Sequence, residues 1–298
     1  MAEEKTLFYN RELSWLEFDK RCLSEAKDKT IPIFERIKFL SITASNLDEF
    51  FMVRIASLTD MVHADYTKKD IAGMTPKEQL DKLKEGTKEF MKNQYHTYNR
   101  SLLPLLETNG LKIVGHYEDL TPEQSKYVDK IFEKDIYPVL TPMAVDSSRP
   151  FPLIKNKSLN IGALIYDKKK DVTDIATVQV PSVLPRIISL PSADKNVKEI
   201  ILLEEVIERN LDKLFLNYDI VCAHPYRIMR NADFSIDEEE TADLLKEIEK
   251  QLKQRQWGEV IRLEVEDNMD KKLLKELKKH LNVADDVVYK INGPLDLT

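Results

Sequence analysis

The stretch SWLEFDKRCLSEA, residues 14–26, predicts that the chain opens with a helical domain. Apolar residues recur there at helical spacing and so share one stripe: Trp15, Phe18, Cys22 and Ala26. Ser14 and Glu17 have the spacing of a capping box, in which each side chain binds a free backbone N–H group of the first turn. We therefore expect a helix that begins at Ser14.

Three further helices are predicted in the first third of the chain. Pro32 opens one, and Asn46 marks another start, because this residue type caps helices and a Glu follows three residues later. Thr75-Pro76-Lys77-Glu78 starts a third with a cap, a proline at the first helical position and an acid at the third. That helix could run to about Leu106, although Pro104 should kink or end it. Antiparallel helices with short loops form a bundle.

The sequence pattern changes after Asn109-Gly110, a typical helix stop. Thr121-Pro122-Glu123-Gln124 announces one more helix, and the prolines of residues 138–152 then favour an ordered but irregular connection. Farther on, β-like runs alternate with helical segments. The runs are residues 159–166, 176–180, 187–190, 220–223 and 260–265, and the helical segments are 206–214, 244–252 and 273–281. We expect an all-α helical bundle over residues 1–112 and an α+β domain, a mixed sheet with helices, over 113–298.

Composition excludes several classes of protein. The 298 residues include 45 basic and 52 acidic side chains, and the net charge of −7 argues against a general binder of nucleic acid or membrane surfaces. No apolar run approaches the ~18–20 residues of a membrane span, and the N-terminus has no secretory pattern. The two cysteines, Cys22 and Cys222, do not suggest a disulfide framework. We expect a cytoplasmic protein without a transmembrane segment, and a peripheral position at the membrane is left open.

Common catalytic and metal-binding motifs are missing from the sequence. It contains no Walker loop, dinucleotide-binding glycine motif, C-x-x-C, H-E-x-x-H or G-x-S-x-G. The five histidines are scattered, and none has a partner at ligand spacing. From the residues alone we predict no catalytic residue and no metal site in this chain.

The densest polar cluster is residues 45–54, SNLDEFFMVR. Asn46 can cap a helix with its side-chain oxygen, or its amide can face a nucleobase, since the amide both donates and accepts hydrogen bonds. The cap is the simpler interpretation from the residues alone. Asp48 and Glu49 are then acids of a first helical turn, and Arg54 is a solvated or ion-paired side chain.

Two other polar clusters follow, at residues 226–233 and 253–258. In the first, strand alternation places Arg227 and Arg230 on opposite faces, and an ordinary strand with solvated arginines explains them equally well. In the second, cations and an indole, followed by Arg262, could hold an anion. Cations at a helix end more often cap the last carbonyl groups.

At these clusters the sequence resembles the ATP-dependent polyphosphate kinases that carry a phosphohistidine. The matching stretches lie in family order over nearly the whole chain. They are NRELSWLEFDKRCL (10–23), SNLDEFFMVRIASL (45–58), PVLTPMAVDSSRPFPLIKNKSLNI (138–161), YRIMRNADFSIDEEE (226–240), RQWGEVIRLEVE (255–266) and GPLDLT (293–298).

The resemblance implies a helical N-terminal domain followed by a head domain through which the protein dimerises or forms a higher homo-oligomer. It implies ATP and polyphosphate as substrates, and it places the adenine contact at Asn46, directly before the LDEF motif. Asn46 could serve as both ligand and cap.

The family's catalytic histidine and magnesium-binding arginines belong to C-terminal domains that follow GPLDLT. We therefore expect an N-terminal fragment without polyphosphate synthesis of its own, with Mg²⁺ bound by the complete enzyme. The complete enzyme would transfer the terminal phosphate of ATP reversibly to polyphosphate. The alternative is a non-catalytic module for protein interaction or dimerisation.

Overall fold

The computed structural model describes residues 7–145, 149–232 and 258–298, which form two compact units. Unit 1 contains residues up to 102, 229–262 and 296–298, and unit 2 contains residues 103–228 and 263–295. Neither unit is one continuous piece of chain, because β7 (Asp219–Arg230) and β8 (Val260–Glu266) both cross the division. A helical region followed by a mixed sheet with helices confirms the predicted fold class.

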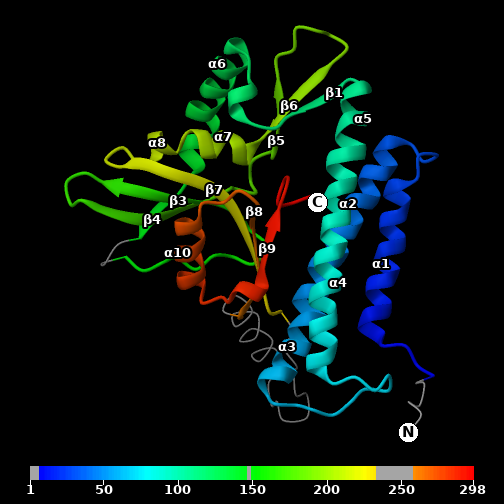
Figure 1. Cartoon of the computed structure of the whole chain (residues 1–298). Coiled ribbons are helices and arrows are strands. Elements are labelled where there is room, and N and C mark those ends of the chain that lie inside the picture. The colour runs from blue at the N-terminus through cyan, green and yellow to red at the C-terminus, as the bar shows by residue number, and fades with distance from the viewer. Residues whose placement is uncertain (1–6, 146–148, 233–257) are drawn as a thin grey trace, which may run out of the picture. The chain divides into compact units, whose positions relative to one another are not determined.

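The long helices of unit 1 run side by side (Figure 1). They are α1 (Arg11–Lys27), α2 (Ile33–Phe50), α3 (Ala56–His63) and α4 (Pro76–Thr97). Each helix buries one stripe of apolar side chains, and the core includes Leu16, Leu23, Leu40, Leu47, Phe50, Leu83 and Phe90. π-Helical turns continue α2 into α3 over Phe51–Ile55 and α4 into α5 (Leu103–Thr108) over Tyr98–Leu102.

The observed helix starts agree with some of the predicted caps and contradict others. The box at Thr75 is present, with the Thr75 hydroxyl accepting from Glu78 N and the Glu78 carboxylate accepting from Thr75 N. Pro32 directly precedes α2, as predicted. The start at Ser14 is wrong, because α1 begins one turn earlier with Asn10 as its cap. The start at Asn46 is also wrong, because α2 continues through it.

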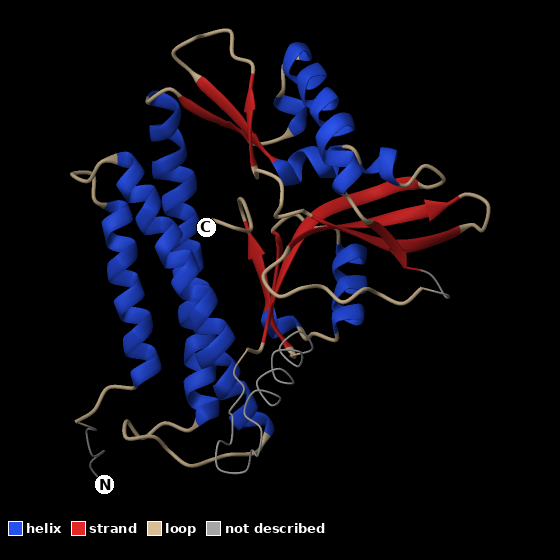
Figure 2. Cartoon of the chain, turned by 180° about the vertical axis from the view of Figure 1, so that it is seen from behind, coloured by secondary structure: helices blue, strands red, loops and turns tan. Residues whose placement is uncertain are grey.

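Unit 2 contains most of a six-stranded sheet in the order β2-β4-β3-β7-β8-β9. Its central strand β3 (Leu159–Asp167) pairs antiparallel with β4 (Val172–Gln179) and β7. Almost all of β3 is buried, because α7 (Leu203–Arg209) and α10 (Lys271–Leu281) cover its two faces (Figure 2). β9 (Val288–Ile291) pairs parallel with β8 at one edge.

A second, smaller sheet of unit 2 has the order β1-β6-β5. Its strands are β1 (Leu111–Val114), β6 (Lys198–Leu202) and β5 (Ile187–Leu190). Two helices complete the unit, α6 (Pro122–Ile131) with its predicted capping box and the single turn α8 (Leu211–Leu214).

Four short strands were missed by the sequence analysis: β1, β2 (Pro142–Val145), β6 and β9. β2 corrects the prediction of an irregular connection there. Pro142 can begin this strand because β2 lies at the sheet edge, where a residue without N–H does not interrupt a ladder. The predicted helix at residues 244–252 lies outside the described residues.

Gly110 allows the chain to turn from α5 into β1. Its φ is +80°, and a Cβ there would lie 2.6 Å from the backbone oxygen of Asn196. We expect Gly110→Ala to lower the free energy of unfolding by about 1–3 kcal/mol, because it adds backbone strain and a collision with backbone. Gly115→Ala is the control, since a Cβ there meets no atom within 4 Å. Urea denaturation checks this, and equal midpoints for the two variants would contradict it.

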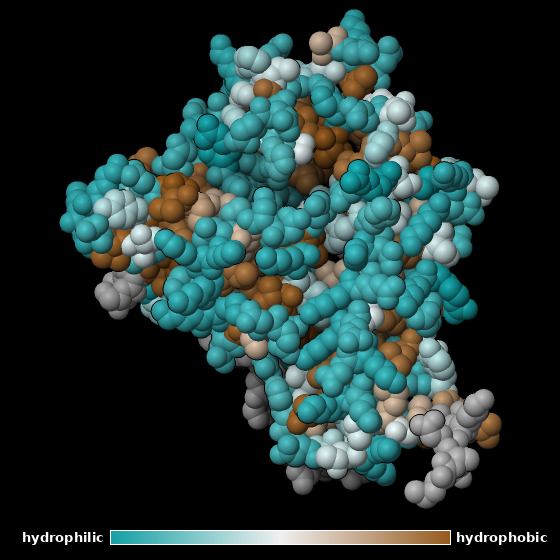
Figure 3. Space-filling model, in the orientation of Figure 1, coloured by the Kyte–Doolittle hydropathy of each residue, from teal (hydrophilic) through white to brown (hydrophobic). Residues whose placement is uncertain are grey.

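The surface is rich in charge, in keeping with the composition. Hydrophilic side chains cover most of the face in Figure 3, and hydrophobic ones gather in separate patches. Within the described residues, no helix combines the length and the apolar character needed to cross a membrane.

Candidate functional site

The candidate site lies on the seam between α1 and α2, where antiparallel helices bring pairs of side chains together. Asn46 Nδ2 donates to Asp19 Oδ1 over 3.0 Å. One helical turn away, Trp15 stacks on Phe50 with ring centroids 4.1 Å apart and planes inclined by 2°. The two pairs follow one another by four residues on each helix, so they lie on the same stripe.

Asn46 is a half-buried residue near the end of α2, which excludes the cap interpretation. Its hydrogen bond to Asp19 uses one N–H of the amide. The side-chain oxygen and the second N–H have no hydrogen-bonding partner among the described residues. The side chain can therefore offer one acceptor and one donor to a ligand.

Asp19 is the most unusual group of the seam. Its side chain is fully buried, and its Oδ2 atom has no hydrogen-bond partner. Burial removes water from the carboxylate and raises the pKa of Asp19 from 3.8 to about 6, although the hydrogen bond from Asn46 opposes this shift. Asp19 thus accepts from Asn46 as a carboxylate at neutral pH, at a cost in stability.

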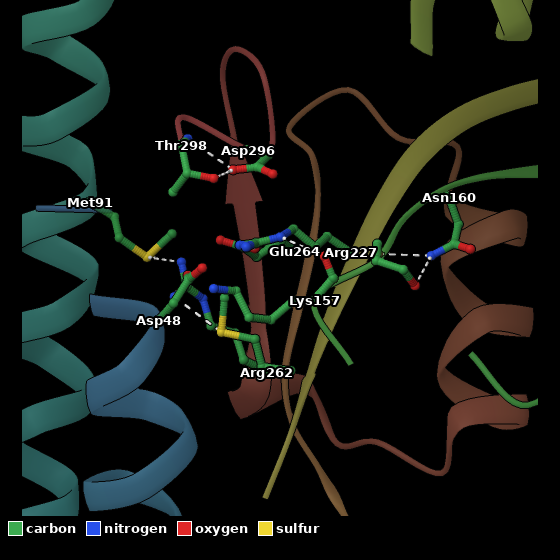
Figure 4. A network of polar contacts seen from close by, with 11 residues as sticks. Asp48, Met91, Lys157, Asn160, Arg227, Arg262, Glu264, Asp296 and Thr298 are labelled. Atoms are coloured by element: carbon green, nitrogen blue, oxygen red, sulfur yellow. Dashed lines mark hydrogen bonds and ion pairs between the residues drawn. The ribbon is translucent and has the colours of Figure 1, made fainter. Parts of the chain in front are cut away.

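The other residues of the first cluster have different environments. Asp48 is 3% exposed and lies 3.8 Å from Arg262, so its interpretation as an acid of a first helical turn is wrong. The Arg262 guanidinium lies 4.5 Å from the centroid of Phe51, and its Nη2 is 3.2 Å from the sulfur of Met91 (Figure 4). Glu49 is exposed but lies near the end of α2, so its interpretation as an acid of a first helical turn is also wrong. Arg54 is exposed, as expected for a solvated side chain.

The arginines of the second cluster are buried, so their interpretation as solvated side chains is wrong. Arg227 and Glu264 form an ion pair at 3.0 Å, and each side chain is 3% exposed (Figure 4). Arg230 donates to the backbone oxygen of Gly258. In the third cluster residues 253–257 lie outside the described residues, and Arg262 belongs to strand β8.

Unit 2 holds a group of acids that sequence reasoning did not single out. Neighbouring carboxylates and burial raise the pKa of Glu205 to about 8 and that of Glu208 to about 9, with burial the larger cause. The Glu266 carboxylate, which contributes to both shifts, accepts a hydrogen bond from His224 Nδ1 over 2.8 Å. Within the described residues, no three His, Cys, Asp or Glu side chains are arranged to hold a metal ion.

The raised pKa values predict that unit 2 loses stability as the pH rises through neutrality. The unfolded chain releases these two protons near pH 4.5, whereas folded unit 2 retains them until about pH 8 at Glu205 and about pH 9 at Glu208. We therefore expect the free energy of unfolding to fall by on the order of 5 kcal/mol between about pH 5 and about pH 9, and to level off above that range. Glu205→Gln with Glu208→Gln should remove most of this fall, whereas exposed Glu107→Gln should leave it unchanged. Urea midpoints across the pH range check this, and parallel pH profiles for all three proteins would contradict it.

Family models match almost the whole chain. Residues 8–114 match the polyphosphate kinase N-terminal domain, and residues 123–298 match the polyphosphate kinase middle domain.

Individual proteins agree with the family models. The chain is 48% identical to a polyphosphate kinase of Lactiplantibacillus plantarum over 99% of its own length and 41% of that protein. It is 48% identical to one of Bacillus anthracis over 98% of this chain and 42% of that protein. The crystal structure of polyphosphate kinase from Porphyromonas gingivalis superposes with a TM-score of 0.78 at 25% identity, covering 97% of this chain and 40% of that one. The chain therefore spans about two fifths of the length of these relatives.

Proposed function

The chain belongs to the polyphosphate kinase family, and from this membership we propose that it is the nucleotide-contacting and oligomer-forming part of an ATP–polyphosphate phosphotransferase. The complete enzyme transfers the terminal phosphate of ATP reversibly to polyphosphate through a phosphohistidine. Mg²⁺ is the cofactor of the complete enzyme. The helical domain meets the head domain near residue 112, and the head domain mediates dimerisation in a cytoplasmic enzyme.

Asn46 is the residue that contacts adenine. The observation that carries this is its hydrogen bond to Asp19, because a carboxylate can only accept, so it fixes the amide with Nδ2 toward Asp19. The amide oxygen is then free to accept from the exocyclic amine of adenine, while the second N–H donates to a ring nitrogen. Guanine presents an oxygen where adenine presents an amine, so this arrangement favours ATP over GTP. Asp19 acts through Asn46 as a positioning residue.

We expect Asn46→Ala to weaken ATP binding at this site at least tenfold, because the variant loses both hydrogen bonds to the base. Isothermal titration of the 298-residue chain with ATP and GTP measures this. Asn93→Ala, an exposed asparagine on α4, is the matched control and should bind like the parent. Equal ATP affinity in the parent and in Asn46→Ala would contradict the assignment of Asn46.

The alternative is a non-catalytic module for dimerisation, and it gives a different result. In that case the chain forms a stable dimer by analytical ultracentrifugation, and the titration shows no nucleotide binding that Asn46→Ala weakens. Binding of ATP that depends on Asn46 favours the proposed enzyme segment.

A further inference from the structure

A pocket of about 410 Å³ opens beside the first turn of α1 in unit 1. Its walls come from the start of α1, the π-helical turn, α3, the loop that precedes α4 and the first turn of α4. The residues that line it include Tyr9, Arg54, Leu58, Tyr66, Lys68 and Lys69. The volume lies in the range of small-molecule sites.

The two acids of this pocket are already satisfied by the protein. Glu12 accepts from the guanidinium of neighbouring Arg11. Asp70 accepts from the Asn10 amide through one oxygen, and from the backbone N–H groups of Ala72 and Met74 through the other. These contacts hold the loop against α1 and leave neither carboxylate dependent on a ligand.

The remaining cations are not satisfied in this way. Arg54 and Lys68 are exposed and form no ion pair with any residue in the described part of the chain. Lys69 is also exposed and lies near Glu78, whose pKa it helps to lower. The pocket therefore has an excess of positive charge, which a phosphate group would neutralise.

Aromatic and aliphatic side chains form the rest of the lining. The rings of Tyr9 and Tyr66 are 67% and 49% exposed, although they stand beside a pocket where they could be covered. Leu58 and Pro76 are buried and form an apolar wall. Exposed tyrosines next to cations offer stacking surfaces for a planar base, which a bare chain of phosphates would not use.

We propose that this pocket binds a nucleotide, with its base against Tyr9 and Tyr66 and its phosphates on Arg54 and Lys68. The site is distinct from the contact at Asn46, because Arg54 lies eight residues farther along the helical run, a rise of about 12 Å. It goes beyond the proposed function and does not rest on it. The chain then holds two nucleotide contacts, of which only one includes Asn46.

The test uses Asn46→Ala as the background, so that binding at the first site is removed. Equilibrium dialysis with ATP, adenosine and tripolyphosphate should show that this variant binds ATP more tightly than either fragment. Adding Arg54→Ala and Lys68→Ala should weaken ATP binding at least tenfold, and adding Tyr66→Leu should weaken it severalfold. Lys27→Ala with Lys29→Ala removes two exposed cations at the other end of α1 and should have no effect.

Three results would overturn the proposal. Asn46→Ala could bind no ATP, its ATP binding could survive the loss of both cations, or tripolyphosphate could bind as tightly as ATP. The last result would indicate a site for the anion alone. Failure of the Asn46 assignment would be recognised separately. It would appear as equal ATP affinity of the parent and of Asn46→Ala in the isothermal titration, independently of the result for the Arg54→Ala variant.

Discussion

Glu264→Gln is expected to lower the free energy of unfolding of unit 2 by about 3–5 kcal/mol. Glu264 and Arg227 are buried to the same degree, and their 3.0 Å ion pair lies between neighbouring strands of the larger sheet. The glutamine has nearly the same shape, so no cavity forms. The cost arises because the guanidinium of Arg227 keeps its charge in a place where water cannot solvate it.

Two further variants show whether charge is the cause. Replacing both partners, with Arg227→Met and Glu264→Leu, removes the buried charges and should recover most of the lost stability. Lys38→Met breaks the exposed pair with Glu35 and should cost less than about 1 kcal/mol. Urea denaturation of the three variants decides the matter. A Glu264→Gln midpoint equal to that of Lys38→Met would contradict the prediction.

Local signals in the sequence correctly predicted two helix starts at which all the capping residues lie within four consecutive positions. The Thr75 and Thr121 boxes each combine a hydroxyl, a proline and a carboxylate or amide, and both form as predicted. Ser14 had the same spacing but no proline, and Asn10 capped the helix one turn earlier. The long buried strand β3 was also predicted, because its apolar run, residues 159–166, has the length of a strand and is shorter than a typical helix.

The candidate site could not be predicted in the same way, because its contacts join residues that are distant in sequence. Nothing near Asn46 in the chain indicates that Asp19, 27 residues earlier, would accept from its amide. Likewise, the sequence around Arg227 does not indicate its ion pair with Glu264, because the two residues meet only through the pairing of neighbouring strands. In each case tertiary contacts overrode the local interpretation. The resemblance of the LDEF motif to a known family identified Asn46, but it did not identify Asp19.

Asp19→Asn is expected to stabilise unit 1 at neutral pH by up to about 3 kcal/mol. The folded protein raises the pKa of Asp19 from 3.8 to about 6, so the unfolded chain releases this proton more readily. Stability therefore falls as the pH rises from about 4 to about 6, and the full cost is present at pH 7. Asparagine has no charge to bury, and its amide oxygen can still accept from Asn46.

The size of this gain should depend on pH, which separates it from a simple packing effect. Urea midpoints of Asp19→Asn and of the parent should differ at pH 7 and converge at pH 4, where Asp19 is largely protonated in the folded state. Asp28→Asn, at the exposed C-terminal end of α1, is the control and should give no gain, because hydrogen bonds from Thr30 lower the pKa of Asp28. An equal gain from Asp19→Asn at both pH values would contradict the assigned cause.

The substitution should also weaken the preference for ATP over GTP, because an asparagine can donate as well as accept and so permits Asn46 to turn its amide around.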